Sequence, residues 1–365
     1  MKKIMFIMTK FGGTGWGGAH KVSVMLANYL SRNGYDVSIA VSEHARIDYP
    51  IDSAIKKYFL CDLYKQSNIR AINLLKKMKA FRSLCKQNKI DLVVGFTSNM
   101  AIYAIMAAVF SKRKSLISER TDPHIEPRKK ILRGLRNMLF CLADKVVFQT
   151  PGARDYFPKI VRKKSWIIPN PISNDLPAVY NGEREKRIVN FCRIAPQKNL
   201  QVLFQAFDIF YEQHPQYTLE IYGDAKEGSE YITNLTKFLA GLKSKNHISI
   251  YGARQDIHEH IFNATAFASS SDYEGISNSM LEAMAIGLPV VVTDCQNGGE
   301  RMCIEDGESG LIVPRNNPEA IAHALCRIVE DKEFADKISK NAVKIKDRFS
   351  YSKIFNLWEE IIEKV

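Results

Sequence analysis

The chain has 365 residues, of which 46% are hydrophobic and 25% charged, a composition typical of a globular protein and not of a disordered one. Its net charge of +13 is unevenly spread, because residues 1–172 carry 31 lysines and arginines against 11 acidic residues, a net +20, and residues 173–365 carry a net −7. No apolar run approaches the ~18–20 residues of a membrane span. The apolar run 4–8 is too short for a signal peptide and is expected to be a first buried strand.

Short apolar runs alternate with helical patterns through the first half of the chain, which is typical of a parallel sheet covered by helices. The clearest helix begins near Ala19 and ends at Gly34, a residue suited to the left-handed turn that follows a helix. A second, apolar helix is expected at Met100–Phe110. The predicted strands of this half are Lys3–Met8, Asp36–Val41, Asp91–Gly95, Ser115–Ser118 and Lys145–Phe148.

Two prolines, Pro169 and Pro171, interrupt this pattern, because so close a pair fits neither a helix nor a central strand. The polar segment 181–187 follows, and the alternation of strands and helices then restarts. Asn317 before Pro318 marks the beginning of a capped helix. The predicted strands of this half are Ile188–Cys192, Thr218–Tyr222, Ile248–Tyr251, Ala266–Ser269, Pro289–Thr293 and Gly310–Val313.

These elements predict an α/β chain of two doubly wound, Rossmann-like domains. We expect an N-terminal acceptor-binding domain at 1–172, a C-terminal donor-binding domain at 173–350, and a final helix at 351–365 that can pack back on the first domain. Ligands bind at the carboxyl ends of parallel strands, so a donor and an acceptor are expected to meet in a cleft between the two sheets.

The strongest chemical signal is the stretch 272–289, in which Glu274 and Glu282 are separated by seven residues. A strand precedes Glu274 and a helix carries Glu282, so backbone amides of a helix N-terminus are expected beside them, where they suit phosphate or sugar oxygens. Those amides belong to Gly275, Ile276, Ser277 and Asn278. Alternatively, Ser279-x-x-Glu282 fits a capping box, in which Glu282 only satisfies a backbone N–H.

A second signal is the pair of cations Arg193 and Lys198, in the loop after the first strand of the second half. Two fixed positive charges at a strand end can stabilise the negative charge that develops on a departing diphosphate. The alternative is a solvated basic loop, because charged loop residues are mostly just exposed.

A glycine-rich segment follows the first strand, and glycines allow a backbone to approach a ligand closely. Its candidates for donor contacts are Gly17, Gly18 and His20. The pattern Gly13-x-Gly15-x-x-Gly18 also fits a dinucleotide fingerprint, which makes an NAD(P)-dependent oxidoreductase the main alternative function. That fingerprint should follow the strand directly, whereas several residues intervene here.

Weaker candidates lie at three other strand ends. Glu119 and Arg120 follow a strand of the first half, where an ion-paired structural loop is an equal alternative. Turns that could border the donor, or be turns only, contain Gly223, Asp224, Gly299 and Arg301.

No metal is expected in the reaction, because the sequence has no D-x-D and no cysteine or histidine cluster with ligand spacing. His258 and His260 lie two apart on a predicted helix, so they point to different faces and are expected at the surface. The seven cysteines are scattered without a C-x-x-C pair and are expected to be reduced core residues of a cytosolic protein.

The stretch 272–289 resembles the E-x7-E signature of glycosyltransferase family 4, whose members are retaining enzymes with the two-domain GT-B fold, and the likeness extends over nearly the whole chain. The resemblance implies that Glu274 contacts hydroxyls of the donor sugar and that Glu282 holds the ribose. Ser277 stands where the family usually has proline.

The other signals fit the same family. Arg193 and Lys198 are similar to its R-x4-K motif, which clamps the donor phosphates, and Gly17 and Gly18 are similar to its N-terminal glycine-rich loop. Arg120 stands where many relatives have a histidine that touches the donor sugar.

The resemblance implies transfer of a hexose or N-acetylhexosamine, with retention, from a nucleotide-diphosphate sugar to a lipid-linked glycan in surface polysaccharide or glycan assembly. A UDP-sugar is favoured, the leaving phosphate takes the acceptor proton, and no protein base or cofactor is expected. A non-catalytic glycan-binding scaffold is a further alternative. The complete set of cations and glutamates argues against it.

Basic and apolar residues alternate in the segments 65–86 and 128–136, a pattern typical of amphipathic helices on an anionic membrane surface. The alternative is a packed helix whose basic face is solvated. With the net +20 of this half, we expect peripheral binding to the inner face of the cytoplasmic membrane. No nucleic-acid-binding module is recognisable, so nucleic acid is not expected as a partner.

Overall fold

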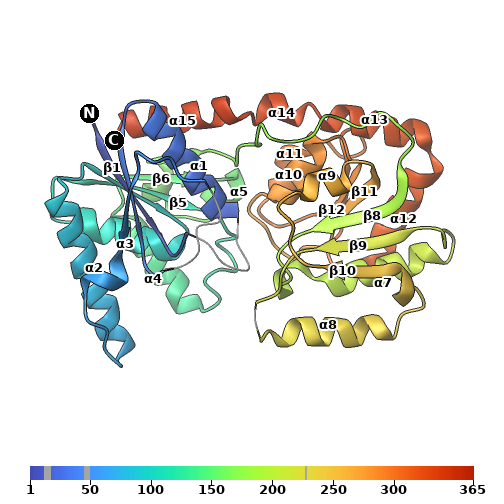
Figure 1. The fold of residues 1–365 in the computed structure, drawn as a ribbon, viewed down its shortest axis with the longest axis horizontal. Coiled ribbons are helices and arrows are strands. Elements are labelled where there is room, and N and C mark those ends of the chain that lie inside the picture. Colours follow the sequence, from blue (N-terminus) through green and yellow to red (C-terminus); the bar gives the residue numbers. More distant parts are fainter. Residues whose placement is uncertain (12–17, 45–49, 227) are drawn as a thin grey trace. The chain divides into compact units, whose positions relative to one another are not determined.

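In the computed structural model of the chain, the described residues are 1–11, 18–44, 50–226 and 228–365, with Arg70 described by its backbone only. They form two compact units (Figure 1). The first unit is Met1–Pro169 together with Ile354–Val365, and the second unit is Asn170–Lys353. The division falls in the proline-containing stretch, and each unit is built on one parallel sheet flanked by helices, which confirms the predicted α/β class.

The first unit contains a seven-stranded parallel sheet in the order β3-β2-β1-β4-β5-β6-β7. All of Ile4–Met8 in the interior strand β1 is buried, because an interior parallel strand is covered on both faces. The edge strands β3 and β7 were missed by the sequence analysis, since each is short and partly exposed. The strands are β1 (Lys3–Met8), β2 (Asp36–Val41), β3 (Lys56–Phe59), β4 (Leu92–Phe96), β5 (Lys114–Glu119), β6 (Lys145–Phe148) and β7 (Ser165–Ile167).

Helices connect these strands. The first helix ends shortly before Gly34, whose φ of +85° is the predicted left-handed turn. Phe81, Ile105 and Phe140, from three different helices, pack into one core with the strands. The helices are α1 (Gly18–Arg32), the 3₁₀ turn η1 (Leu60–Leu63), α2 (Arg70–Gln87), α3 (Ser98–Ala108), α4 (Lys130–Phe140), α5 (Pro151–Asp155) and α6 (Lys159–Arg162).

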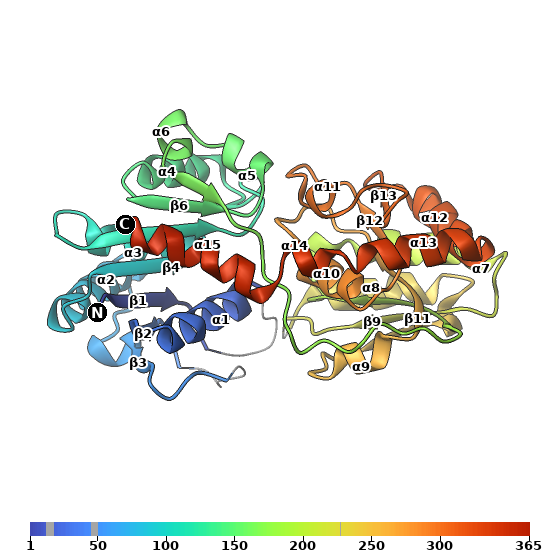
Figure 2. The same cartoon turned by 90° about the horizontal axis from the view of Figure 1, so that it is seen from above.

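The last helix, α15 (Tyr351–Glu363), lies along the first unit beside α1 (Figure 2). Its Trp358 is fully buried and stacks on Phe96 of β4 with ring centroids 5.1 Å apart. The hydroxyl of Tyr29 on α1 donates to Oε2 of Glu359 at 3.0 Å. The expectation that the C-terminal helix packs on the first domain is therefore confirmed.

The second unit contains a six-stranded parallel sheet in the order β10-β9-β8-β11-β12-β13. Thr218–Tyr222 and Ile248–Tyr251 have the predicted bounds, and the other predicted strands are shifted by a few residues at their ends. The strands are β8 (Glu185–Phe191), β9 (Thr218–Tyr222), β10 (Ile248–Tyr251), β11 (Ala264–Ser269), β12 (Val290–Thr293) and β13 (Leu311–Val313).

The helices of this unit enclose a second core, in which Phe204, Phe207 and Leu325 are buried. The predicted cap is present, because Oδ1 of Asn317 accepts a hydrogen bond from the Ala320 N–H at 2.9 Å. The helices are the 3₁₀ turn η2 (Pro196–Lys198), α7 (Leu200–Tyr211), α8 (Glu230–Ala240), η3 (Lys245–His247), α9 (Ile257–Ile261), α10 (Asn278–Ala285), α11 (Gly299–Cys303), α12 (Pro318–Glu330), α13 (Lys332–Ala342) and α14 (Ile345–Arg348).

Within the described residues, no helix is both long enough and apolar enough to cross a bilayer. All seven cysteines belong to the described part of the chain, and all are free thiols. Cys85, Cys295, Cys303 and Cys326 are buried, as predicted. The core-filling prediction is wrong for Cys61, which lies partly exposed in the turn η1 after β3.

Candidate active site

The candidate site of the second unit lies where two strand-end loops meet. The order of the sheet reverses at β8, which pairs with β9 on one side and β11 on the other, and parallel sheets bind ligands at the carboxyl edge beside such a reversal. The hydroxyl of Ser270, after β11, donates to the carbonyl oxygens of Lys198 and Asn199, after β8, at 3.0 and 2.9 Å. The two predicted motifs therefore form one surface.

The centre of this surface is an ion pair between Lys198 and Glu274, with Nζ 2.5 Å from Oε1. The two side chains are only 13% and 11% exposed. The Ser271 hydroxyl donates to the same carboxylate oxygen at 2.9 Å, and the Gln197 amide donates to the other oxygen at 3.3 Å. These contacts fix the Glu274 carboxylate at the edge of the sheet.

Two opposing effects act on the Lys198 ammonium. Burial lowers its pKa, but the Glu274 carboxylate beside it and the Cys192 sulfur outweigh burial, so the pKa of Lys198 is raised above its usual value. Lys198 is thus held as a cation in a largely buried position. A cation held in this way is suited to a phosphate oxygen.

Arg193 adds a second cation to the same loop. Its side chain is exposed, and Nη2 donates to the Gln197 side-chain oxygen at 3.1 Å. Because the amide of Gln197 also reaches Glu274, Gln197 connects Arg193 to the glutamate that Lys198 contacts directly. The loop can present two positive charges to a single anion.

The structure contradicts the capping-box alternative for Glu282. The cap of α10 is Ser277, whose hydroxyl accepts a hydrogen bond from the Met280 N–H at 3.3 Å, whereas the Ser279 hydroxyl donates to the Phe191 carbonyl at 2.5 Å. Glu282 therefore lies beyond the first turn of the helix. Its carboxylate does not cap the helix.

Glu282 instead pairs with His258 of α9, with Nε2 3.0 Å from Oε2. The expectation that both histidines are surface residues is wrong for His258, which is 16% exposed, because α9 packs its side chain against α10 and the edge of Phe191. His260 is more exposed and pairs with Asp256 on its own helix. The sequence carries no spacing signal for the contact between His258 and Glu282, because the two residues belong to different helices.

The start of α10 and the loop before it contact two other segments of the second unit, one at Asn170 and one at Gly299. Asn278 accepts a hydrogen bond from the Asn170 side chain at 2.5 Å, and Ile276 is buried. The backbone of Gly275 approaches Gly299 closely, since a Cβ on Gly299 would lie 1.9 Å from the Gly275 carbonyl oxygen. The loop that holds the predicted amides can exist only with glycine at 299.

Three other predicted residues have a structural role in this unit. A Cβ on Gly223 would lie 1.7 Å from the Cys192 carbonyl oxygen, so glycine is required for β9 to pass the end of β8. Asp224 accepts from the Ala253 N–H at 3.0 Å, and Arg301 forms a two-point ion pair with Asp294 at 2.9 and 2.6 Å. Contacts of these residues with a donor stay predictions.

Glu300 is a residue that the sequence analysis did not select. It is buried at the start of α11, and burial, reinforced by the charge of Glu274, raises the pKa of its carboxyl to about 7. The signal available in the sequence was an acidic residue directly after two glycines at a strand end. Asn297 beside it donates to the Glu274 carbonyl at 3.1 Å, so this turn supports the Glu274 loop.

In the first unit, Glu119 and Arg120 are held in structural contacts. Glu119 is buried and lies 3.7 Å from Arg136 of α4, and it accepts the Thr121 hydroxyl at 2.7 Å. The Arg120 guanidinium lies over the rings of Phe96 and Trp358, 4.9 and 5.2 Å from their centroids. This placement favours the alternative of an ion-paired structural loop, and a donor contact of Arg120 stays a prediction.

The glycine-rich segment is described only in part. Gly13, Gly15 and Gly17 lie outside the described residues, so the dinucleotide fingerprint and the contact predicted for Gly17 stay predictions. Gly18 begins α1, and burial lowers the pKa of His20 on the same helix, which favours its neutral form. A donor contact of Gly18 or His20 stays a prediction.

Comparison with known families gives two adjoining matches. Residues 174–345 match the family described as glycosyl transferases group 1, and residues 16–176 match the one described as glycosyltransferase family 4. An uncharacterized glycosyltransferase of Haemophilus influenzae is 23% identical over 99% of this chain and 100% of its own length. A GalNAc-α-(1→4)-GalNAc-α-(1→3)-diNAcBac-PP-undecaprenol α-1,4-N-acetyl-D-galactosaminyltransferase of Campylobacter jejuni is 24% identical over 100% of this chain and 99% of its own.

Among solved structures, HepE of Anabaena in complex with UDP and glucose superposes with a TM-score of 0.84 over 100% of both chains, at 17% identity. Sucrose-phosphate synthase of Thermosynechococcus elongatus superposes with a TM-score of 0.83 at 19% identity, over 100% of this chain and 99% of its own. These likenesses establish the GT-B fold for this chain.

Proposed function

The chain belongs to the group 1 glycosyltransferases of family 4, which are retaining enzymes, and we propose that it transfers a hexose or N-acetylhexosamine from a UDP-sugar to a lipid-linked glycan. The setting proposed is the assembly of a surface polysaccharide or glycan. One observation carries the proposal, namely that Arg193, Lys198 and Glu274 meet at the carboxyl ends of the two adjacent strands beside which the sheet order reverses.

The donor diphosphate binds against Arg193 and Lys198 in this proposal. Its arrival supplies Lys198 with an anionic partner, which frees the carboxylate of Glu274 to accept hydrogen bonds from hydroxyls of the sugar. Glu282 accepts from the ribose hydroxyls while His258 holds its carboxylate in place. No metal is required, because two protein cations neutralise the leaving group.

The transfer itself conserves the anomeric configuration. The bond from the anomeric carbon to the diphosphate oxygen breaks, the bond to the acceptor oxygen forms on the same face, and the acceptor proton passes to the departing phosphate. The protein contributes by positioning the reactants and stabilising charge. The UDP donor is favoured because HepE, which has the same fold, was solved with UDP and glucose.

The acceptor is proposed to be a glycan on a polyprenyl diphosphate, because the relative from Campylobacter jejuni is named for such an acceptor. The α4 surface, meaning Ile131, Leu135 and Met138 with the neighbouring Lys130 and Arg133, supports a position on an anionic membrane. These three apolar residues share one helix face and are exposed, with Ile131 86% exposed. Apolar insertion combined with basic residues is the usual basis of interfacial binding.

The first experiment measures thermal stabilisation of the purified chain by UDP, GDP and NAD. Stabilisation by UDP and not by NAD is expected, whereas stabilisation by NAD alone would favour the oxidoreductase alternative. The second experiment supplies UDP-hexoses and a synthetic polyprenyl-diphosphate glycan and detects the product by mass. If UDP stabilises the chain but no UDP-sugar supports transfer, the chain is a nucleotide-binding scaffold and not the proposed enzyme.

Binding to vesicles tests the membrane proposal separately. Flotation with phosphatidylglycerol vesicles is expected to retain the chain at low salt and to release it as salt rises. Ile131→Ser should weaken this binding, and Tyr251→Ser, an exposed hydrophobic residue of the acidic second half, is the matched control. Equal binding to neutral phosphatidylcholine vesicles would contradict the electrostatic part of the proposal.

A further inference from the structure

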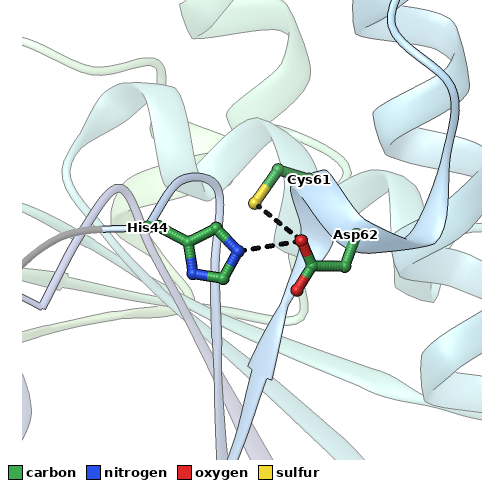
Figure 3. A group of neighbouring side chains, drawn as sticks. All are labelled: His44, Cys61 and Asp62. Carbon is green, nitrogen blue, oxygen red and sulfur yellow. Dashed lines mark hydrogen bonds and ion pairs between the residues drawn. The ribbon is translucent and has the colours of Figure 1, made fainter.

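Three side chains with metal-binding atoms converge in the first unit, outside the residues assigned to sugar transfer. His44 follows β2, and Cys61 and Asp62 lie in the turn η1 that follows β3 (Figure 3). We call these three residues the thiol cluster. One nitrogen, one sulfur and one carboxylate oxygen all lie within 4.8 Å of one another.

We propose that the thiol cluster binds a divalent transition-metal ion, with Zn²⁺ as the physiological candidate. Imidazole nitrogen, thiolate sulfur and carboxylate oxygen are the ligand types that zinc takes in proteins, and a mixed set with sulfur disfavours Mg²⁺ and Ca²⁺. With three protein ligands, the remaining position is filled by water.

Two of the three separations between ligand atoms can be compared with tetrahedral zinc coordination. Cys61 Sγ and Asp62 Oδ1 are 3.7 Å apart, close to the ~3.5 Å expected for zinc bonds of about 2.3 and 2.0 Å at a tetrahedral angle. His44 Nε2 and Asp62 Oδ1 are 2.8 Å apart and need to separate by about 0.5 Å to reach the same geometry. The His44 and Asp62 side chains are 60% and 56% exposed, so rotation of the carboxylate meets no buried packing.

The imidazole is oriented by an aromatic stack that does not involve the other ligands. The His44 ring stacks on Phe59 with centroids 4.2 Å apart, and Phe59 meets the fully buried Phe11 at 5.9 Å. On the other side, a ring nitrogen of His44 faces the Asp62 carboxylate, and Cys61 lies beside that carboxylate (Figure 3). A ligand that is already oriented loses less side-chain entropy when the metal binds.

Metal binding here would join the carboxyl end of β2 to the turn after β3. β2 and β3 are neighbours in the sheet, and β3 is its edge strand. A bound ion therefore fastens the edge of the first unit and stabilises the folded state by mass action. The thiol must lose its proton on binding, so affinity is expected to rise with pH.

A second group in the described residues, His214, Cys326 and Glu330 of the second unit, also brings three such atoms together. Burial raises the pKa of the Cys326 thiol, which disfavours the thiolate that a metal requires. A variant of Cys326 therefore serves as the control for loss of a thiol that does not bind metal.

The experiment is a Co²⁺ titration of the reduced, metal-free full chain, followed by absorbance. Wild type should take up one equivalent and show both a sulfur-to-cobalt charge-transfer band and intense visible bands of tetrahedral cobalt, which Zn²⁺ then removes. Cys61→Ser should abolish the charge-transfer band, and Cys326→Ser should leave it unchanged. His44→Ala and Asp62→Asn should each weaken Co²⁺ binding at least about tenfold.

Thermal unfolding of the same variants supplies a readout that does not depend on colour. Zn²⁺ should raise the melting temperature of wild type and of Cys326→Ser, each relative to its own metal-free form, but not that of Cys61→Ser. The metal-free melting temperature of Cys61→Ser should stay close to that of wild type because Cys61 is partly exposed. The proposal is overturned if wild type shows no charge-transfer band, or if the band persists in Cys61→Ser. A band lost only in Cys326→Ser would likewise overturn it.

Discussion

Lys198 Nζ lies 2.5 Å from Glu274 Oε1, although the two residues are 76 positions apart in the sequence. One residue comes from the loop after β8 and the other from the loop after β11. The pair means that the cation proposed for the donor phosphate and the acid proposed for the donor sugar are held by each other in this structure. Removing either partner therefore has a structural consequence as well as a catalytic one.

The first prediction separates those two consequences. Lys198→Met leaves the Glu274 carboxylate buried without its cation, so we expect a loss of about 3–5 kcal/mol of stability and of at least about 100-fold in turnover. In the double variant Lys198→Met with Glu274→Gln, most of the stability should return, because no unpaired charge is left, while turnover stays lost. Thermal unfolding and a transfer assay measure the two effects. A double variant as unstable as the single one would contradict the assigned role of the ion pair.

The second prediction concerns the contact between His258 and Glu282. His258→Phe removes the partner of the proposed ribose acceptor, so KM for the donor should rise about tenfold with little change in kcat, as expected for lost uniform binding. His258→Gln keeps a hydrogen-bond donor and should have a smaller effect. His260→Phe on the same helix is the matched control, since His260 pairs with Asp256 instead. Equal effects of the His258 and His260 variants would rule out positioning of Glu282.

The third prediction is a pH dependence that originates from Glu300. The pKa of its buried carboxyl is raised to about 7 from an ordinary value of 4.5. Between these values the folded chain keeps a proton that the unfolded chain has lost, so the stability contributed by this group falls as pH rises through about 7. The slope is at most about 1.4 kcal/mol per pH unit.

Glu300→Gln removes this titration. The melting temperature of the variant minus that of wild type should therefore increase from pH 5 to pH 8. Titrating groups that do not interact with Glu300 are common to both proteins and cancel in the difference. A difference that does not change with pH would contradict the raised pKa.

The fourth prediction tests which role Arg120 has. Its guanidinium lies 4.9 and 5.2 Å from the ring centroids of Phe96 and Trp358, so Arg120→Met should lower the melting temperature by losing two cation–π contacts, each worth about 0.5–2 kcal/mol. Donor affinity and turnover per folded molecule should stay near those of wild type. Phe96→Leu, which shortens one side of the same stack, is the matched control for stability. A large loss of turnover with an unchanged melting temperature would instead support the predicted catalytic role.

The sequence alone predicted those features that depend on residues close together in the chain, namely strand positions, a helix cap and motif spacings. The apolar run of Thr218–Tyr222 has the bounds of β9, and Asn317 caps α12, because strand burial and helix capping are decided within a few residues. The spacing between Arg193 and Lys198, and between Glu274 and Glu282, predicted the family, and the family matches confirm it. The short edge strand β3 escaped detection, because its pairing with β2 and not its own pattern makes it a strand.

Only the tertiary structure decided which of these residues act together. Glu282 meets His258, and Arg120 meets Trp358, because the order of the strands and the return of α15 to the first unit bring distant segments into contact. His44 meets Cys61 and Asp62 for the same reason. Such contacts depend on which strands pair and which helices return, and no local spacing encodes them. The sequence therefore determined the elements and the motifs, and packing decided the partners of each charged side chain.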